Sequence, residues 1–199
     1  MKAESIAFTV AGIAFGLVAG WMIGAQQAPR TVAVAPSQGA AAPAASSTAS
    51  SGARAPALDE AMVNALKSKA QTSPTDSKPR VDLANLYFDA EKYDEAIKWY
   101  SEAVKLNPKD VDVTTDLGVA YYYTNQPDKA LAEFDRSLAI NPKHIKTLLN
   151  VGVVKAFGKQ DLKGATDVWQ QLLQLAPDSP EGQAAKRALD SLRSAHPGA

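Results

Sequence analysis

Residues 111–144 read VDVTTDLGVAYYYTNQPDKALAEFDRSLAINPKH, and this stretch decides the fold because the chain repeats its pattern on both sides at a step of 34 residues. Copies that begin at Ser77, Val111 and Ile145 place the same kind of residue in the same column. The shared columns are an apolar residue (Leu83, Leu117, Val151), a small residue (Ala84, Gly118, Gly152), an alanine (Ala96, Ala130), an aromatic residue (Tyr100, Phe134) and a proline (Pro108, Pro142). A fixed period of this length predicts stacked structural repeats.

The third copy keeps this register only if one residue is inserted between Lys159 and Ala165. After the insertion, Trp169, Leu172 and Pro177 fall into the shared columns, so this copy is about 35 residues long. The chain therefore carries three copies, at 77–110, 111–144 and 145–179.

Each copy predicts two amphipathic helices joined by a short polar turn. Apolar side chains recur every three or four residues, as Leu83, Leu86 and Tyr87 do in the first helix of the first copy. The Asn-Pro pairs at 107–108 and 141–142 end the second helix, because the residue before a proline is disfavoured in the helical conformation. One helix pair cannot bury its own apolar face, so the copies must stack.

These columns resemble the tetratricopeptide repeat, whose pattern has a small residue at the eighth place, aromatic residues at the eleventh and twenty-fourth, alanine at the twentieth and proline near the thirty-second. Tyr87 and Tyr121 supply the eleventh place of the first two copies, whereas Lys155 stands there in the third. The resemblance covers about half of the chain and implies an all-α solenoid of three helix pairs. It is specific for the fold and says little about the ligand, because one fold serves many functions.

Capping helices are expected at both ends of the array. Residues 57–72 predict a helix within an N-terminal capping segment, 57–76, because apolar residues have helical spacing there: Leu58, Ala61, Met62, Ala65 and Leu66. Residues 180–195 predict a second helix within the C-terminal segment 180–199, with an apolar stripe (Ala184, Ala188, Leu189, Leu192) and a charged remainder (Lys186, Arg187, Asp190, Arg193). The soluble part should thus contain about eight helices in an open right-handed solenoid.

The N-terminal segment, 1–28, is predicted to be a transmembrane anchor. Residues 5–25 carry no charge, and 21 residues form a helix of about 32 Å, which matches a hydrocarbon core of about 30 Å. A cleaved secretory signal is the alternative. The segment also has glycine at every fourth position, which predicts a flat face for pairing with a second copy or with a partner's membrane helix: Gly12, Gly16, Gly20 and Gly24.

Residues 29–56 consist almost wholly of small residues and proline, so they predict a disordered tether between the anchor and the repeats. Lys2, offset by Glu4, precedes the apolar run, and Arg30 follows it. This distribution weakly favours a cytoplasmic N-terminus. We therefore expect a single-pass protein of a bacterial inner membrane with its repeats in the periplasm, and a cytoplasmic repeat domain is the alternative.

The sequence offers no catalytic constellation. It has no cysteine and two histidines, His144 and His196, which excludes a zinc centre and a cysteine- or histidine-based catalytic triad. No phosphate-binding loop occurs, and 21 basic residues balance 21 acidic ones, so nothing attracts the chain as a whole to nucleic acid. We expect no enzyme activity, no cofactor and no metal. The carboxylates of Asp89, Glu91, Asp94 and Glu95 are interpreted as solvated or helix-capping groups.

The resemblance also implies a binding site. In proteins with this repeat, the first helix of each pair lines a concave groove, and places 2, 5, 9, 12 and 13 point into it. Here those places hold Lys78, Val81, Asn85, Phe88 and Asp89, then Asp112, Thr115, Val119, Tyr122 and Tyr123, then Lys146, Leu149, Val153, Ala156 and Phe157.

Tyr122 and Tyr123 are surplus to the packing column that Tyr121 occupies, which favours binding of a peptide or helix of a partner protein. The alternative is that the C-terminal helix folds back and covers the two tyrosines. The carboxylate-clamp version of the repeat, which captures a chaperone's C-terminus, requires a basic residue where Val81 stands. That function is therefore not expected.

The expected function is a non-catalytic, membrane-tethered scaffold in an envelope complex. The order of anchor, tether, three repeats, the segment Trp169-x-x-Leu172-Leu173, Pro177 and a terminal helix is also similar to bacterial membrane-tethered repeat factors of cytochrome c biogenesis. That resemblance implies a protein that holds apocytochrome c for haem attachment. A third interpretation is a structural assembly subunit that uses its convex surface and its glycine-rich membrane helix.

Overall fold

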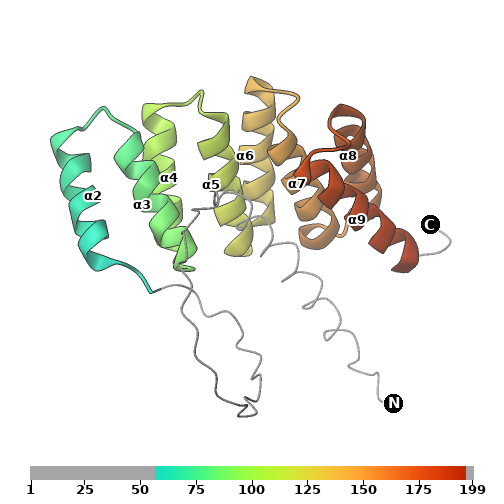
Figure 1. Cartoon of the computed structure of the whole chain (residues 1–199), viewed down its shortest axis with the longest axis horizontal. Helices are drawn as coiled ribbons and strands as arrows, with labels where there is room; N and C mark the ends of the chain where they lie inside the picture. Colours follow the sequence, from blue (N-terminus) through green and yellow to red (C-terminus); the bar gives the residue numbers. More distant parts are fainter. Residues whose placement is uncertain (1–56, 196–199) are drawn as a thin grey trace, which may run out of the picture. The chain divides into compact units, whose positions relative to one another are not determined.

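The computed structural model describes residues 57–195, and helices follow one another along this part of the chain in a single row (Figure 1). The elements are α2 (Glu60–Thr72), α3 (Lys78–Asp89), α4 (Tyr93–Leu106), α5 (Val111–Tyr123), α6 (Pro127–Ile140), α7 (Ile145–Val153), the π-helical segment η1 (Val154–Gly158), α8 (Leu162–Leu175) and α9 (Pro180–Ala195). Each α-helix packs against the next one in sequence. The described residues thus form the all-helical solenoid that the repeats predict, with eight α-helices.

The predicted membrane anchor (1–28) and the tether (29–56) lie outside the described residues, and so do Gly12, Gly16, Gly20 and Gly24. The longest helix between residues 57 and 195 is α9, with 16 residues. In this part of the chain every helix is too short or too polar to cross a lipid bilayer.

Aspartate side chains fix the start of three helices. Asp59, Asp110 and Asp161 each accept a hydrogen bond from the backbone N–H three residues later, at 3.0, 3.1 and 2.8 Å. These bonds satisfy N–H groups that have no partner within the helix. Because Asp59 is the cap, α2 begins at Glu60 and is shorter than the helix predicted over 57–72.

The two capping helices differ in how well the sequence predicted their buried faces. In α2 the buried residues are Val63 and Ala70, which the predicted stripe did not include. Leu58 and Leu66 of the predicted stripe pack against the first apolar cluster, whereas Met62 is 49% exposed. The stripe was therefore predicted only in part. The helix α9 has the predicted bounds, and its charged residues are exposed as expected, while Ala184 and Leu189 are buried.

The turn within each repeat recurs with the same backbone geometry. Glu91, Asn125 and Gln160 have positive φ angles of 57°, 58° and 56°, so each occupies the left-handed region that ends a helix. The step from the first to the second is 34 residues, and the step from the second to the third is 35. The inserted residue of the third copy therefore precedes Gln160.

The π-helical segment η1 absorbs this insertion. The backbone N–H of Lys159 donates to the carbonyl of Val154 at 3.0 Å, a bond one residue longer than an α-helical one. The insertion thus lies within Val154–Gly158. The sequence columns predict it between Lys159 and Ala165, and this prediction is wrong. Lys155, which breaks the aromatic column, belongs to this segment.

Small residues and aromatic rings pair within the second and third repeats as the columns predict. A Cβ atom on Gly118 would approach the ring of Phe134 to 2.5 Å, and a Cβ atom on Gly152 would overlap the indole of Trp169. Phe134 and Trp169 are fully buried. Glycine is thus required at both positions because the partner ring lies directly against the backbone.

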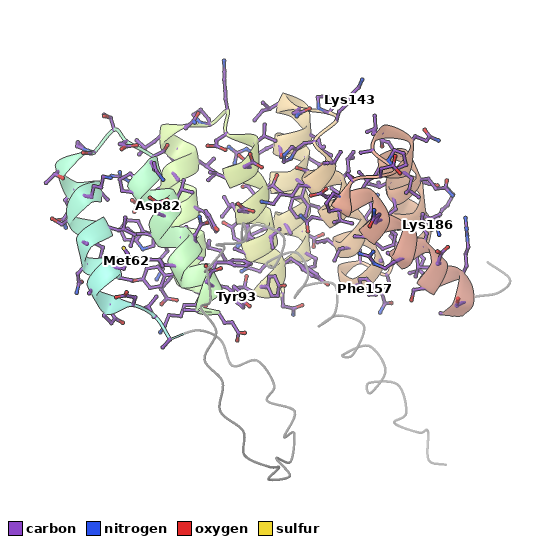
Figure 2. All side chains as sticks on the ribbon, in the orientation of Figure 1. Met62, Asp82, Tyr93, Lys143, Phe157 and Lys186 are labelled. Carbon is purple, nitrogen blue, oxygen red and sulfur yellow. The ribbon has the colours of Figure 1, made fainter. Side chains whose placement is uncertain are left out.

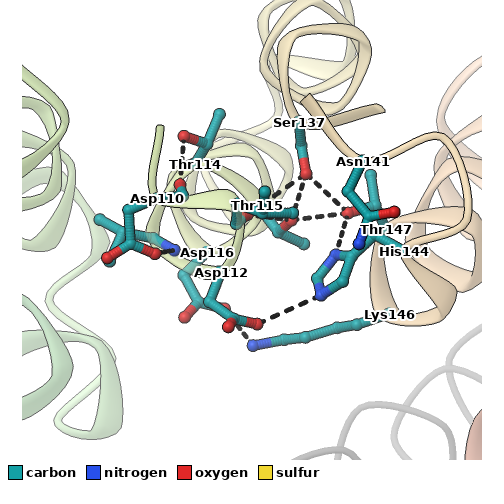
Figure 3. A network of polar contacts seen from close by, with 12 residues as sticks. Asp110, Asp112, Thr114, Thr115, Asp116, Ser137, Asn141, His144, Lys146 and Thr147 are labelled. Carbon is teal, nitrogen blue, oxygen red and sulfur yellow. Dashed lines mark hydrogen bonds and ion pairs between the residues drawn. The ribbon is translucent and has the colours of Figure 1, made fainter. Parts of the chain in front are cut away.

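Two apolar clusters lie along the array. The first includes buried residues of α2, α3, α4 and α5, and the second includes Phe134 of α6, Val151 of α7 and Val154 of η1. Between repeats 2 and 3, three buried hydroxyl groups meet: those of Thr115, Ser137 and Thr147, from α5, α6 and α7 (Figure 3). Their oxygens lie 2.7–2.9 Å apart, so the three hydroxyl groups form hydrogen bonds with one another at this junction.

Candidate functional site

Four aromatic rings from three helices meet at one edge of the repeat array. Tyr93 and Tyr123 are stacked, with ring centroids 4.7 Å apart. Phe88 contacts both of them edge-on, at 5.2 Å and 5.5 Å, and Tyr122 contacts Tyr123 at 6.3 Å. We call these four residues the ring cluster. Figure 2 shows Tyr93 and Phe157 at the lower edge of the array, whereas Lys143 lies at the opposite edge.

The repeat geometry brings these rings together. Phe88 is near the C-terminal end of α3, Tyr123 is the last residue of α5, and Tyr93 is the first residue of α4. Because α3 and α4 belong to one repeat and α5 begins the next, the rings join two successive repeats at the turn end of their helices. Offset and edge-on pairs of this kind are the favoured arrangements of aromatic rings.

The tyrosines of the ring cluster are half-buried. Burial raises the pKa of Tyr122 to about 12. Burial, with smaller contributions from Tyr93, Tyr122 and Glu91, raises the pKa of Tyr123 to about 12. Both phenols are therefore neutral at physiological pH and offer an apolar ring with one hydroxyl group, a combination that is common at protein interfaces.

An open pocket of about 590 Å³ lies beside the stacked tyrosines. It is lined by Glu91, Lys92, Tyr93, Asp94, Glu95, Tyr123, Thr124, Asn125 and Gln126. Three of these residues are acidic and one is basic. At the start of α4 no side chain makes a capping hydrogen bond, so the expected capping role of the acidic residues is not seen there. Asp94 and Glu95 lie in the first turn of α4, where the helix dipole favours negative charge.

The two lysines that were assigned to the groove are paired with aspartates. Lys78 lies 3.0 Å from Asp82, and Lys146 of α7 lies 2.7 Å from Asp116 of α5. Burial raises the pKa of Asp116, while the charge of Lys146 acts in the opposite direction. The second pair therefore links repeats 2 and 3 and partly compensates for the burial of the Asp116 carboxylate.

The structure divides the predicted groove residues into three groups. Lys78, Asn85, Asp89, Asp112 and Phe157 are exposed, and Val81, Phe88, Val119, Tyr122, Tyr123 and Lys146 are half-buried. Leu149 and Val153 are 2% and 6% exposed, and Thr115 and Ala156 are also buried. α9 packs against α7, which carries Leu149 and Val153. These two residues belong to the core in this structure, which corrects the expectation that they line an open wall.

Sequence reasoning missed several members of the site. Tyr93 has no aromatic counterpart in the second copy, where Pro127 occupies the same place, so no column marks it. Asp82 and Asp116 share the sixth place of their copies, and only the structure brings Asp116 to Lys146. The run from Glu91 to Glu95 could have been recognised in the sequence as part of the site, because three carboxylates next to an aromatic residue form a local acidic patch.

The site is a surface of aromatic rings, hydroxyl groups and charged side chains. No group of His, Cys, Asp and Glu residues between 57 and 195 could hold a metal ion. His144 contacts the hydroxyl of Thr147 and the carboxylate of Asp112, at 2.7 and 3.3 Å, in a network that joins helices (Figure 3). The half-buried rings, the pocket and the neighbouring charges are the features that a partner molecule could recognise.

Comparison with known proteins identifies the repeats. The family described as TPR repeat matches residues 84–125, and the family described as tetratricopeptide repeat matches residues 113–144. The chain thus contains tetratricopeptide repeats, as the columns predict. None of the curated proteins matches the chain.

Solved structures show the same fold. A MamA protein is similar with a TM-score of 0.54 and 22% identity, over 57% of this chain and 62% of the MamA chain, so the match spans less than two thirds of that protein. The first TPR of Spaghetti (RPAP3) bound to an HSP90 peptide is similar with a TM-score of 0.55 and 25% identity, over 60% of this chain and 94% of that one. The Arabidopsis OM64 TPR domain is similar with a TM-score of 0.53 and 20% identity, over 58% of this chain and 95% of that one.

Proposed function

We propose that the tetratricopeptide repeats of this chain form a non-catalytic adaptor that binds a peptide or helix of a partner protein at the ring cluster. Proteins with this repeat are generally protein-interaction adaptors. The observation that carries the proposal is the meeting of Phe88, Tyr93 and Tyr123 across two repeats, next to an open pocket. Aromatic side chains at a surface are the residues that most often dominate binding energy at protein interfaces.

The similar Spaghetti (RPAP3) domain supports the class of ligand, because that domain is bound to an HSP90 peptide. The kind of peptide should differ here. Val81 stands where a carboxylate clamp requires a basic residue, and Lys78 and Lys146 are already paired with aspartates. We therefore propose peptide binding without capture of an acidic C-terminus.

We further propose that residues 1–28 tether the adaptor to a membrane, with the repeats in the periplasm of a bacterium. The uncharged run of 21 residues supports the anchor, and the glycines at every fourth position support pairing of the anchor with a second copy or a partner helix. A tether restricts the repeats to the membrane surface and raises their effective concentration toward partners there.

Holding apocytochrome c for haem attachment stays an alternative within this proposal. The residues that carry that resemblance have structural roles: Trp169 and Leu172 are fully buried, and the indole N–H of Trp169 donates to the carbonyl of Leu149 at 3.1 Å. No surface residue distinguishes an apocytochrome from another partner. The general adaptor is therefore the function that we put forward.

The proposed binding site is tested by capturing partners of the full-length protein from mildly solubilised membranes. The wild type is compared with a triple variant, Tyr122→Ala, Tyr123→Ala and Phe157→Ala, and with a control, Tyr122→Phe and Tyr123→Phe, that keeps both rings. We expect the triple variant to lose partners that the control retains, while its helices are retained at the temperature of the capture. The same partners in all three samples would contradict binding at this edge, and haem-attachment proteins among the lost partners would favour the apocytochrome alternative.

Tethering is tested separately by washing membranes at alkaline pH. The wild type should stay in the membrane fraction, whereas a chain without residues 1–28 should be released, because an apolar helix of this length inserts stably. Release of the wild type would contradict a transmembrane anchor.

A further inference from the structure

We infer that the partner segment is basic and carries an apolar or aromatic residue, so that its cationic side chains face the carboxylates around the pocket while the apolar residue packs on the ring cluster. This inference rests on the proposed function and deepens it by specifying the chemistry of the ligand. The charges, the rings and the pocket at this edge all support such a ligand.

Negative charge exceeds positive charge at this edge in the part of the chain that the structure describes. Among residues 57–195, the carboxylates of Asp89, Glu91, Asp94 and Glu95 form no ion pair. Lys92 is the one basic residue among those that line the pocket. An acidic ligand would meet like charge here, whereas a basic one would find complementary charge.

The two lysines assigned to the groove lie at the other end of their helices from the pocket. Lys78 is the first residue of α3 and pairs with Asp82 at 3.0 Å, and Lys146 is the second residue of α7 and pairs with Asp116 at 2.7 Å. Neither lysine lines the pocket, so neither would offset its negative charge. A basic ligand would break no ion pair of the pocket, because Glu91, Asp94 and Glu95 form none within the described residues.

The rings suit a ligand that combines a cation with an apolar group. Tyr93 and Tyr123 line the pocket and stack on each other, and Phe88 covers the same pair edge-on. The face of a tyrosine ring attracts ammonium and guanidinium groups, and the ring edge packs against apolar side chains. Lysine or arginine next to an aliphatic or aromatic residue would therefore contact the carboxylates and the rings at the same time.

Burial strengthens the case for a cation at one of the carboxylates. Asp89, at the end of α3, is partly desolvated, and this raises its pKa. A partly desolvated carboxylate gains more from a nearby positive charge than a fully hydrated one does. A basic side chain over the end of α3 would thus supply a positive charge that Asp89 does not receive from residues 57–195.

The test measures binding of synthetic peptides to the full-length protein in mild detergent by fluorescence anisotropy. Three labelled peptides share their length and their leucine and phenylalanine positions, and carry lysine, serine or glutamate at the remaining positions. The acidic-patch variant is Glu91→Gln, Asp94→Asn and Glu95→Gln. The matched control, Glu60→Gln, Asp135→Asn and Asp178→Asn, changes the net charge equally at exposed positions elsewhere.

We expect the lysine peptide to bind best, and the acidic-patch variant to weaken it by about five- to tenfold at low salt, as expected for several exposed charge pairs. The control variant should change its affinity by less than about twofold, because distant exposed charges are screened. Equal effects of the two variants, or equal affinity for the glutamate peptide, would overturn the inference.

The outcomes also separate this inference from the proposed function. If the serine peptide binds as well as the lysine peptide, and the Tyr122→Ala, Tyr123→Ala and Phe157→Ala variant loses both, the adaptor function stands and the basic ligand is refuted. If no peptide binds and the triple variant keeps all captured partners, both are refuted. Circular dichroism of each variant verifies that the helices are retained.

Discussion

Buried hydroxyl groups distinguish the junction between repeats 2 and 3 from the junction between repeats 1 and 2, although both junctions contain an apolar cluster. At the first, Val104 of α4 and Leu117 of α5 belong to one apolar cluster, and the ring cluster bridges the same repeats at the edge. At the second, an apolar cluster includes Phe134 and Val151, and the hydroxyls of Thr115, Ser137 and Thr147 lie in contact beside it, between α5, α6 and α7 (Figure 3). The two junctions join equivalent helices, so the fold alone does not dictate which chemistry is used.

Apolar contacts and hydroxyl contacts contribute differently to stability and to helix orientation. Apolar contacts are non-directional and stabilise in proportion to the area that they bury. A hydroxyl cluster stabilises less, but it requires each oxygen to face its partners, so it fixes the orientation of one helix relative to the next. We therefore expect apolar burial to supply most of the stability at both junctions and the hydroxyl cluster to set the angle between repeats 2 and 3.

Leu117→Ala should have the largest effect of the changes considered. Leu117 is 3% exposed within the apolar cluster, and removing a buried leucine side chain costs about 2–5 kcal/mol. Urea unfolding followed by circular dichroism measures the loss. The matched control is Leu106→Ala, since Leu106 is 38% exposed and its truncation should cost less than about 0.5 kcal/mol. Equal losses of stability in the two variants would show that burial of Leu117 in the apolar cluster does not stabilise the first junction.

Thr115→Val should cost about 1–3 kcal/mol, because it leaves the buried hydroxyls of Ser137 and Thr147 with one partner fewer. The triple change Thr115→Val, Ser137→Ala and Thr147→Val removes the whole cluster, and its cost should be smaller than the sum of the three single changes. Urea unfolding of all four variants measures this coupling. Additive costs would mean that the three hydroxyls act independently.

The sequence predicted the parts of the fold that recur. The periods of 34 residues, the small-residue column at Gly118 and Gly152 and the prolines at helix ends all report contacts that each repeat makes within itself, and the structure confirms them. The π-helical insertion was detected as a shift in register but was misplaced, because one inserted residue can be absorbed anywhere in a turn without leaving a mark in the sequence.

The contacts between repeats could not be predicted in the same way. Thr115 occupies a place that was assigned to the groove, and its burial depends on Ser137 and Thr147, which lie 22 and 32 residues further along. Asp116 and Lys146 likewise meet only after the helices have stacked. Contacts that one junction alone makes produce no column, so the ring cluster was predicted only in part, through Phe88, Tyr122 and Tyr123.

Alkaline pH should act on the first junction, which carries the ring cluster. Burial raises the pKa values of Tyr122 and Tyr123 to about 12, above their ordinary value of 10.0. The folded state therefore favours the neutral phenols, and the stability that they contribute is complete below pH 10 and is lost as the pH rises toward about 12. Absorbance of tyrosinate and circular dichroism, recorded together from pH 9 to 13, should show ionisation of these residues coinciding with loss of helix.

Tyr122→Phe and Tyr123→Phe together provide the control for this titration. Phenylalanine keeps the ring and removes the titrating hydroxyl, so the double variant should resist alkaline unfolding better than the wild type. Thr115→Val should lower the stability at every pH but leave its dependence on pH between 9 and 12 unchanged, because the hydroxyl cluster lies at the other junction. An alkaline transition that the double variant does not alter would place the sensitive groups elsewhere.

The smallest effect is expected for Asp116→Asn, which removes the ion pair of the second junction. Burial raises the pKa of Asp116 above its ordinary value, so the stability that this group contributes is present at low pH and is lost as the pH rises through the folded-state pKa. The asparagine variant should therefore gain stability relative to the wild type between about pH 4 and pH 7, with a net change within about 1 kcal/mol at neutral pH. Lys146→Met should reduce the stability more than Asp116→Asn does, because it leaves the partly buried carboxylate of Asp116 without the cation that lies 2.7 Å away. If the asparagine variant instead lost several kcal/mol at neutral pH, the ion pair and not the hydroxyl cluster would hold the second junction.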